Sequence, residues 1–268
     1  MRLAMHDGAP AGVANPEIVA AFQPQFAACD AIYAFARSQR PDRPPSPDPA
    51  GRLILATYAR GSKSYQGALR LAHIGYGAQS LMLGRSLYED MLVAHWIKLN
   101  PQQAPRQLDD HRRMTLAVYQ SELRRFGLDP PEAAQIDRAE RYQLRREFGS
   151  GHWTKLSMDA LRAAVQDEFP EQDSHRRLLL QVDTLLHRHA NLIVHHSFLS
   201  LGGAAAAAGE SSITYDVGAS TRFMPQALFI AFFSYIHLTS LVVPRSKQGE
   251  LARLWHDHRA AFTVARAV

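Results

Sequence analysis

Residues 183–200 concentrate polar side chains that could do chemistry on an otherwise apolar stretch of the chain. If the segment is helical, Arg188, Asn191 and His195 project from one face within about two turns. Leucine, isoleucine and valine cover most of the remaining circumference, which is typical of a helix buried on several sides. A guanidinium, an amide and an imidazole would then lie close together beside packed surface.

An arginine followed at short spacing by a histidine is typical of metal-independent ribonucleases, although such a short motif also occurs by chance. In those enzymes the imidazole moves a proton at the ribose 2′-hydroxyl, while the guanidinium holds the scissile phosphate. Arg188 and His195 have this spacing on an apolar helix. Arg253 and His258 have it too, in a charged segment. Because of its apolar context, we predict that the first pair is catalytic.

Further polar residues surround this pair. His189 and His196 repeat the seven-residue spacing one position further round the helix. We expect Asn191 and His196 to orient substrate or imidazole, and His189 to bind substrate or support the site. The structural alternative is that Arg188 forms an ion pair and that His195 is a buried imidazole bonded to a backbone carbonyl.

Two further pairs are spaced four residues apart, as neighbours on a helix surface are. Arg85 and Glu89 lie on an apolar helix, so we expect each to neutralise a buried partner, either the other or Arg188. Asp183 and His187 could bind a metal, but a zinc site needs a third donor at a predictable spacing, and none is evident. The sequence therefore predicts no metal site and no cofactor.

Helical periods of apolar residues recur along the chain, and no segment shows convincing strand alternation. We expect at least six helices in an all-α bundle. The proline-dense residues 41–49 predict an extended connector, which divides the chain into an amino-terminal helical arm, 1–50, and a bundle domain, 51–268. The expected helices are 16–40 with a kink at Pro24, 53–99 as one helix or two, one from Pro105 through 125, one from Pro130 through 146, 157–169, 173–198, and two after the connector that follows Gly203.

Residues 223–244 contain no charged side chain and are long enough to be considered as a membrane span. Pro225, Gln226 and His237 oppose that interpretation, and no second segment resembles a span. We expect a core helix of the bundle and no membrane association.

Charge and cysteine content bound the function only loosely. The net charge of +5 comes from 30 basic and 25 acidic residues, and both signs alternate through residues 106–146, as on a solvated helix face. This balance tolerates an anionic partner without requiring one.

Cys29 is the only cysteine, which excludes an intramolecular disulfide and favours a cytoplasmic location. The amino terminus lacks the apolar core of a signal peptide.

Three blocks of the sequence carry a resemblance: RSLYEDMLVAHWI from Arg85, HWTKLSMDALRAA from His152, and LIVHHSFLSL after Asn191. They resemble a family of uncharacterised bacterial helical proteins, a domain of unknown function. That family is similar to the higher eukaryote and prokaryote nucleotide-binding (HEPN) helical bundles, many of which are dimeric toxin or defence ribonucleases. The matching positions are Arg85, Glu89, Trp153, His195 or His196, and Ser197.

The resemblance implies a HEPN-like bundle and an endoribonuclease with an antitoxin or defence partner protein. A homodimer is expected because one helix face offers a single Arg188 and a single His195, and a two-fold axis doubles that set. The alternative is a non-catalytic helical module that binds a nucleotide or a protein.

Overall fold

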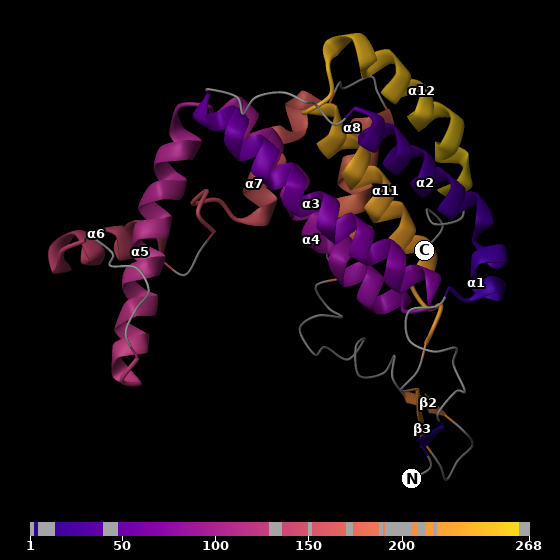
Figure 1. The fold of residues 1–268 in the computed structure, drawn as a ribbon, viewed down its shortest axis with the longest axis horizontal. Coiled ribbons are helices and arrows are strands. Elements are labelled where there is room, and N and C mark those ends of the chain that lie inside the picture. Colours follow the sequence, from indigo (N-terminus) through magenta and orange to yellow (C-terminus); the bar gives the residue numbers. More distant parts are fainter. Residues whose placement is uncertain are drawn as a thin grey trace.

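A computed structural model describes residues 3–4, 14–39, 48–128, 136–149, 152–169, 174–187, 190, 205–207, 213–216 and 219–262. Within these ranges the chain is mostly helical, as Figure 1 shows, so the predicted all-α class is confirmed.

The amino-terminal helix is broken once, near the proline where a kink was expected. α1 (Pro16–Ala21) ends at Phe22 and α2 (Gln23–Ser38) begins beside it. Pro24 has no N–H to bond back into the preceding turn, so one continuous helix cannot form there. α2 packs against the carboxyl-terminal helices in the common core. The division of the chain at residue 50 stays a prediction.

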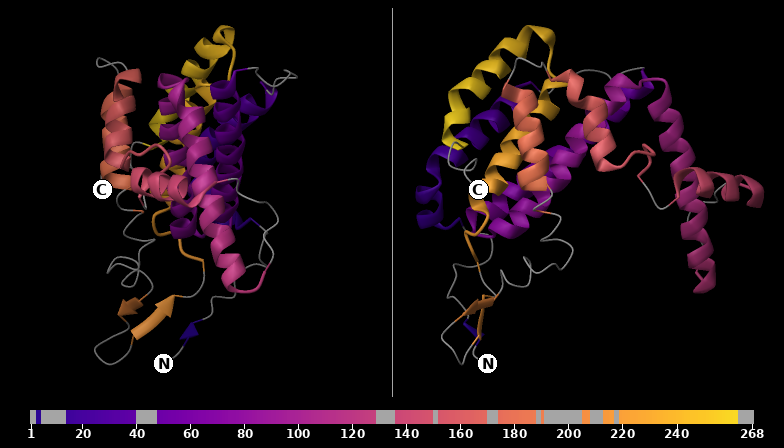
Figure 2. Two further views of the ribbon diagram at one scale, coloured as in Figure 1. Left: turned by 90° about the vertical axis from the view of Figure 1, so that its left-hand side faces the viewer. Right: turned by 180° about the vertical axis from the view of Figure 1, so that it is seen from behind.

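A long antiparallel pair, α3 (Pro49–His73) and α4 (Gly77–Leu99), forms the centre of the bundle (Figures 1 and 2). The Asp48 side chain accepts hydrogen bonds from the backbone of Ala50 and Gly51, and Pro49 occupies the first helical position. Gly75, at φ +90°, adopts a conformation that favours glycine and allows the reversal between the helices. The two-helix form of the prediction is therefore the correct one.

Two charged helices extend away from the bundle, α5 (Gln103–Arg125) and α6 (Arg138–Phe148), as Figure 1 and the right-hand view of Figure 2 show. They share a small apolar cluster of Met114, Leu144 and Phe148. Asp137 caps α6 by accepting from the Glu140 N–H at 2.8 Å. α6 therefore begins seven to eight residues later than predicted, and residues 129–135 lie outside the described ranges.

Three short helical segments follow in the chain: α7 (Met158–Val165), which packs against α4, η1 (Gln166–Glu168) and α8 (Ser174–Gln181). Ser157 caps α7 by accepting from the Ala160 N–H at 3.2 Å, as its position in the sequence predicted. α8 continues as η2 (Val182–His187), a π-helix. The predicted helix over 173–198 is thus helical across 174–187, and it changes there from α-helix to π-helix at Val182.

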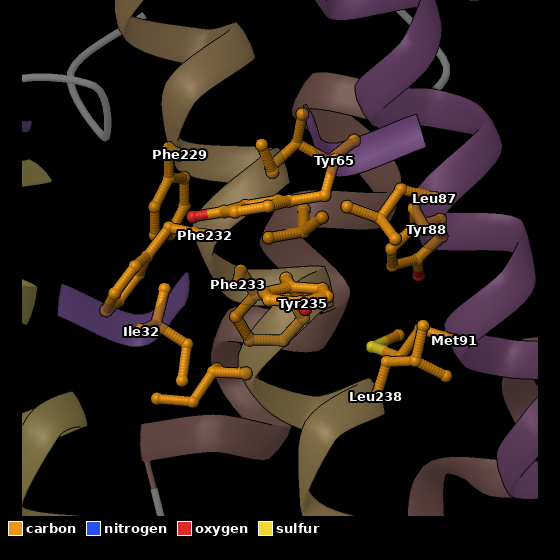
Figure 3. Packing of buried hydrophobic residues seen from close by; sticks show 14 of the residues in the cluster. Ile32, Tyr65, Leu87, Tyr88, Met91, Phe229, Phe232, Phe233, Tyr235 and Leu238 are labelled. Atoms are coloured by element: carbon orange, nitrogen blue, oxygen red, sulfur yellow. The ribbon is translucent and has the colours of Figure 1, made fainter. Parts of the chain in front are cut away.

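The apolar segment near the carboxyl terminus is the core helix α11 (Met224–Ser240), which packs against α2, α3 and α4. Figure 3 shows its aromatic side chains, among them Phe232 and Tyr235, beside residues of the central pair such as Tyr65. Close packing needs small residues, and a methyl group on Gly84 of α4 would lie 2.4 Å from Ile230. Within the described ranges, no helix combines the length and the apolar character that crossing a bilayer requires.

Helical segments follow α11 up to residue 262, where the described part of the chain stops. η3 (Arg245–Lys247), α12 (Gln248–His258) and η4 (Arg259–Phe262) close the core beside α2.

Among the described residues, a small sheet is formed by three short strands, β1 (Leu3–Ala4), β2 (Ala205–Ala207) and β3 (Ile213–Asp216), in the order β1-β3-β2. β3 is parallel to β1 and antiparallel to β2. The sequence predicted a connector here and no strand, so β2 and β3 were not expected. Strands of two to four residues are too short to show an alternating pattern.

Candidate functional site

An ion pair on α4 forms the exposed part of the candidate site. Arg85 Nη2 lies 2.8 Å from Glu89 Oε1, and the two side chains are 22% and 28% exposed. The four-residue spacing places both on one helix face, so each neutralises the other, as one of the predicted arrangements requires. Among the described residues, the buried Nε of Arg85 has no hydrogen-bond partner.

The imidazole of His187 binds the same carboxylate from the other side. His187 Nε2 donates to Glu89 Oε1 at 3.1 Å, and the ring is buried against Tyr88 with centroids 5.2 Å apart. Burial would raise the pKa of Glu89, but the hydrogen bond from His187 and the charge of Arg85 outweigh it and lower the pKa below its ordinary value. Glu89 is therefore a charged acceptor shared by a cation and an imidazole.

A second, more deeply buried set of groups lies next to this one. Asp183 Oδ1 accepts from the Tyr88 hydroxyl at 3.3 Å, and Asp183 Oδ2 lies 3.2 Å from Arg162 Nε. Burial, and then the negative charge of Asp183, raises the pKa of Tyr88 far above its ordinary value, so its hydroxyl stays protonated and donates. The buried carboxylate thus has both an ion-pair partner and a hydrogen-bond donor, as a buried charge requires.

The π-helix η2 brings the two sets together. Asp183 and His187 both lie on it, and consecutive α4 residues receive them: Tyr88 contacts Asp183, and Glu89 contacts His187. Single π-helical turns are rare and are frequently found at functional sites.

The structure also bears on the metal alternative that the sequence left open. Asp183 contacts Arg162 and Tyr88, whereas His187 contacts Glu89, so the two residues have different partners. Across the described part of the chain, no group of three or more histidine, cysteine, aspartate or glutamate side chains could hold a metal ion.

The cluster of Arg85, Glu89 and His187 contains the groups that proton transfer and anion binding use. A carboxylate hydrogen-bonded to an imidazole fixes the orientation of the ring and stabilises its charged form. The guanidinium can bind a phosphate or carboxylate oxygen. Arg85 and Glu89 reach solvent, whereas His187 is buried, so a ligand would meet the ion pair first.

The predicted site residues divide into two sets. Arg85 and Glu89 are brought together with each other, whereas six others lie outside the described residues, so their roles stay predictions: Arg188, His189, Asn191, His195, His196 and Ser197.

Tyr88 and Arg162 were not predicted from the sequence, and Asp183 and His187 were considered only as metal ligands. The available signals were the position of Tyr88 beside Glu89 in RSLYED, and that of Arg162 as the one basic residue of α7.

A model of the family of unknown function (DUF5677) matches residues 51–204, more than half of the chain. The chain belongs to this family. The DUF5677 match includes α4, α7 and η2 and therefore every member of the cluster, and it ends before α11 and α12. It agrees with the expected membership of an uncharacterised family. No curated protein and no solved structure matches the chain.

Proposed function

We propose that this DUF5677 chain is a metal-independent endoribonuclease of the HEPN-like kind, with Arg188 and His195 as the catalytic pair. The observation that carries the proposal is the anchoring of His187, the residue before Arg188, to Glu89 and so to Arg85. His187 itself is held beside the partly exposed guanidinium of Arg85, and the segment proposed to carry the catalytic pair follows it in the sequence. A site for a phosphodiester needs such a combination of cations and imidazoles.

The chemistry needs no cofactor. His195 removes the proton of a ribose 2′-hydroxyl, and the 2′-oxygen attacks the adjacent phosphorus. The bond from phosphorus to the 5′-oxygen breaks, and that oxygen takes a proton from an imidazolium. Arg188 stabilises the charge on the phosphate oxygens. The products are a 2′,3′-cyclic phosphate and a 5′-hydroxyl.

The remaining residues position these groups. Arg85 adds a second positive charge near the phosphate, and the Glu89 carboxylate limits the repulsion between the cations. Asn191 and His196 orient substrate or imidazole, and His189 and Ser197 lie in the same segment.

A homodimer brings two copies of Arg188 and His195 to one RNA, so that one imidazole takes a proton while the other returns one. An enzyme of this kind acts as a toxin or defence protein and requires an antitoxin or defence partner to restrain it.

The test is cleavage of a mixed RNA pool by the purified full chain in EDTA. Wild-type protein is expected to cleave, and Arg188→Ala and His195→Ala are each expected to lose about 100-fold or more in rate, as loss of a general base or of electrostatic stabilisation does. The matched controls are Arg253→Ala and His258→Ala, because this pair on α12 has a similar spacing outside the site. These two variants should cleave at the wild-type rate.

Two outcomes would contradict the proposal. Cleavage that is unchanged in both Arg188→Ala and His195→Ala would assign the activity to other residues. RNA binding without cleavage by wild-type protein would instead support the non-catalytic binding module.

A further inference from the structure

The outer face of α6 carries three arginines around one aromatic ring. α6 crosses α5 outside the bundle, as Figure 1 shows. Arg138 lies four residues before Tyr142, and Arg145 and Arg146 lie three and four residues after it, so the four side chains share one side of the helix. All four residues are exposed, and Tyr142 is 67% exposed. These four residues, the α6 face, present a flat ring between cations.

The acidic residues of α6 do not neutralise these cations. Glu140 pairs with Arg113 of α5 at 2.6 Å, and Glu147 pairs with Lys155 at 2.9 Å. Asp137 accepts from a backbone N–H as the helix cap. Within the described part of the chain, the three arginines of the α6 face form no ion pair. The face therefore has an unbalanced positive charge that favours an anionic partner.

The other side of α6 is fixed by packing, which limits what that partner can be. Leu144 and Phe148 are buried against Met114 of α5, so the helix cannot turn its apolar side into a membrane. Among the described residues of α6, Tyr142 is the only exposed large apolar side chain. One ring is too little for the apolar centre of a protein interface.

A single-stranded nucleic acid matches the chemistry of this face. An exposed aromatic ring stacks on the face of any base, and the bases of a single strand are open to such contact, whereas those of a duplex are covered by their neighbours. Guanidinium groups bind phosphate oxygens through two parallel hydrogen bonds. Alternating phosphates and bases therefore meet alternating cations and ring.

A short packed segment joins α6 to the helix that carries the candidate site. Lys155 holds the end of α6 through Glu147, and two residues earlier Trp153 packs edge-to-face on Trp96 of α4, with ring centroids 5.5 Å apart. Trp96 lies seven residues after Glu89, which is two turns along the same side of α4. The α6 face thus belongs to an element that is anchored on α4.

We infer that the α6 face binds single-stranded RNA, with a base stacked on Tyr142 and the neighbouring phosphates bound by Arg138, Arg145 and Arg146. The choice of RNA over DNA rests on the proposed ribonuclease function. The face binds the strand outside the residues that are proposed to cleave it.

The test is a fluorescence anisotropy titration of the full chain with an end-labelled 2′-O-methyl RNA. A length of about 10 nucleotides is within the site size of single-strand binding surfaces. This probe has no 2′-hydroxyl, so the proposed cleavage chemistry cannot act on it. Failure to bind the probe and failure to cleave unmodified RNA are therefore separate results. Wild-type protein is expected to bind, and no binding at 50 μM protein in about 50 mM salt, where phosphate contacts are strong, would overturn the inference.

A triple variant, Arg138→Gln with Arg145→Gln and Arg146→Gln, tests the phosphate contacts. Each phosphate contact to a single strand contributes about 0.7 to the slope of log affinity against log salt concentration. Loss of three contacts should lower the magnitude of that slope by about 2. Because the three side chains are exposed and form no ion pair among the described residues, the fold should be retained.

The matched control removes the same charge from the bundle. It replaces three arginines that are exposed on the described surface outside α5 and α6: Arg222→Gln, Arg245→Gln and Arg253→Gln. This variant should keep the wild-type slope. Equal slopes for the two triple variants would overturn the inference, because the attraction would then depend on net charge alone.

Tyr142 tests the stacking contact. Tyr142→Ala should weaken binding about tenfold or more at every salt concentration without a change of slope, because a stacked base is lost and no phosphate contact is. Tyr142→Phe keeps the ring and should bind as wild type does. An affinity of Tyr142→Ala equal to that of wild type would overturn the assignment of this face.

Two other ligands complete the test. Tighter binding of DNA of the same sequence would overturn the choice of RNA. Binding to phosphatidylserine vesicles, with no binding to the oligonucleotide, would assign the α6 face to a membrane surface and overturn the inference.

Discussion

At the scale of single residues, the candidate site combines contacts between residues that are close in the sequence with contacts between residues that are far apart in it. The pair of Arg85 and Glu89 could be predicted, because a four-residue spacing on a helix determines which side chains meet. The contact of Glu89 with His187 could not be, because it joins residues 98 positions apart and depends on how η2 packs against α4. Local spacing contains no information on such a contact.

Removal of the Glu89 carboxylate should destabilise the fold. Glu89→Ala leaves the buried His187 Nε2 and the Arg85 guanidinium without their acceptor, so the free energy of unfolding should fall by about 1 to 3 kcal/mol. Chemical denaturation measures this change. The control Glu122→Ala removes an exposed pair with Arg125 and should change stability by less than about 0.5 kcal/mol. Equal effects of the two substitutions would show that the Glu89 contacts do not support the structure.

The buried His95 predicts a dependence of stability on pH. Burial lowers the pKa of His95 from 6.5 to about 4. Between these values the unfolded chain binds a proton that the folded chain does not, so the free energy of unfolding falls as the pH is lowered from 6.5 to 4. The loss is about 3 kcal/mol, and above pH 6.5 this group has no effect.

His95→Phe should remove that part of the dependence, because phenylalanine does not titrate. The difference between the two denaturation series isolates His95 from the other histidines. Parallel curves for wild type and His95→Phe between these pH values would contradict the assignment.

At the scale of elements, the sequence predicted helices best where a local device sets their ends. Ser157 caps a helix where a boundary was predicted, and Gly75 lies in a segment for which one helix or two were expected, because caps and a positive φ depend on nearest neighbours. α3, by contrast, begins at Pro49 with Asp48 as its cap, before the predicted start at residue 53 and inside the predicted connector. The π-helical winding of η2 could not be predicted, since apolar periodicity does not separate one π turn from an α-helix.

The crossing of α4 and α11 depends on a glycine. A Cβ on Gly84 would meet Ile230 Cγ2 at 2.4 Å, so Gly84→Ala should separate the helices and lower the free energy of unfolding by about 1 to 3 kcal/mol. Gly249→Ala on α12 is the matched control, because nothing lies within 4 Å of its added methyl. It should be neutral or stabilise by up to about 1 kcal/mol, since alanine favours helix. Thermal unfolding of the two variants gives the comparison, and a Gly84→Ala variant as stable as wild type would rule out the close crossing.

At the scale of the whole molecule, two arrangements of helices could not be predicted from the sequence. α5 and α6 leave the bundle because their apolar stripe is satisfied by their own small cluster, which charge patterning alone did not show. A cavity beside His95 is lined by residues of α4, inside the DUF5677 match, and by residues of α11 and α12, which lie outside it. Both features depend on which helices become neighbours, and only the assembled core determines that.

The most direct measurement of the proposed function is the chemistry of the RNA ends after cleavage in EDTA. Attack by the 2′-hydroxyl requires fragments that end in a 2′,3′-cyclic phosphate and begin with a 5′-hydroxyl. Mass spectrometry of the products of a short defined RNA distinguishes these ends from 5′-phosphate and 3′-hydroxyl ends. We expect cyclic phosphate ends from wild-type protein and none from His195→Ala, whereas 5′-phosphate and 3′-hydroxyl ends would contradict the proposed mechanism.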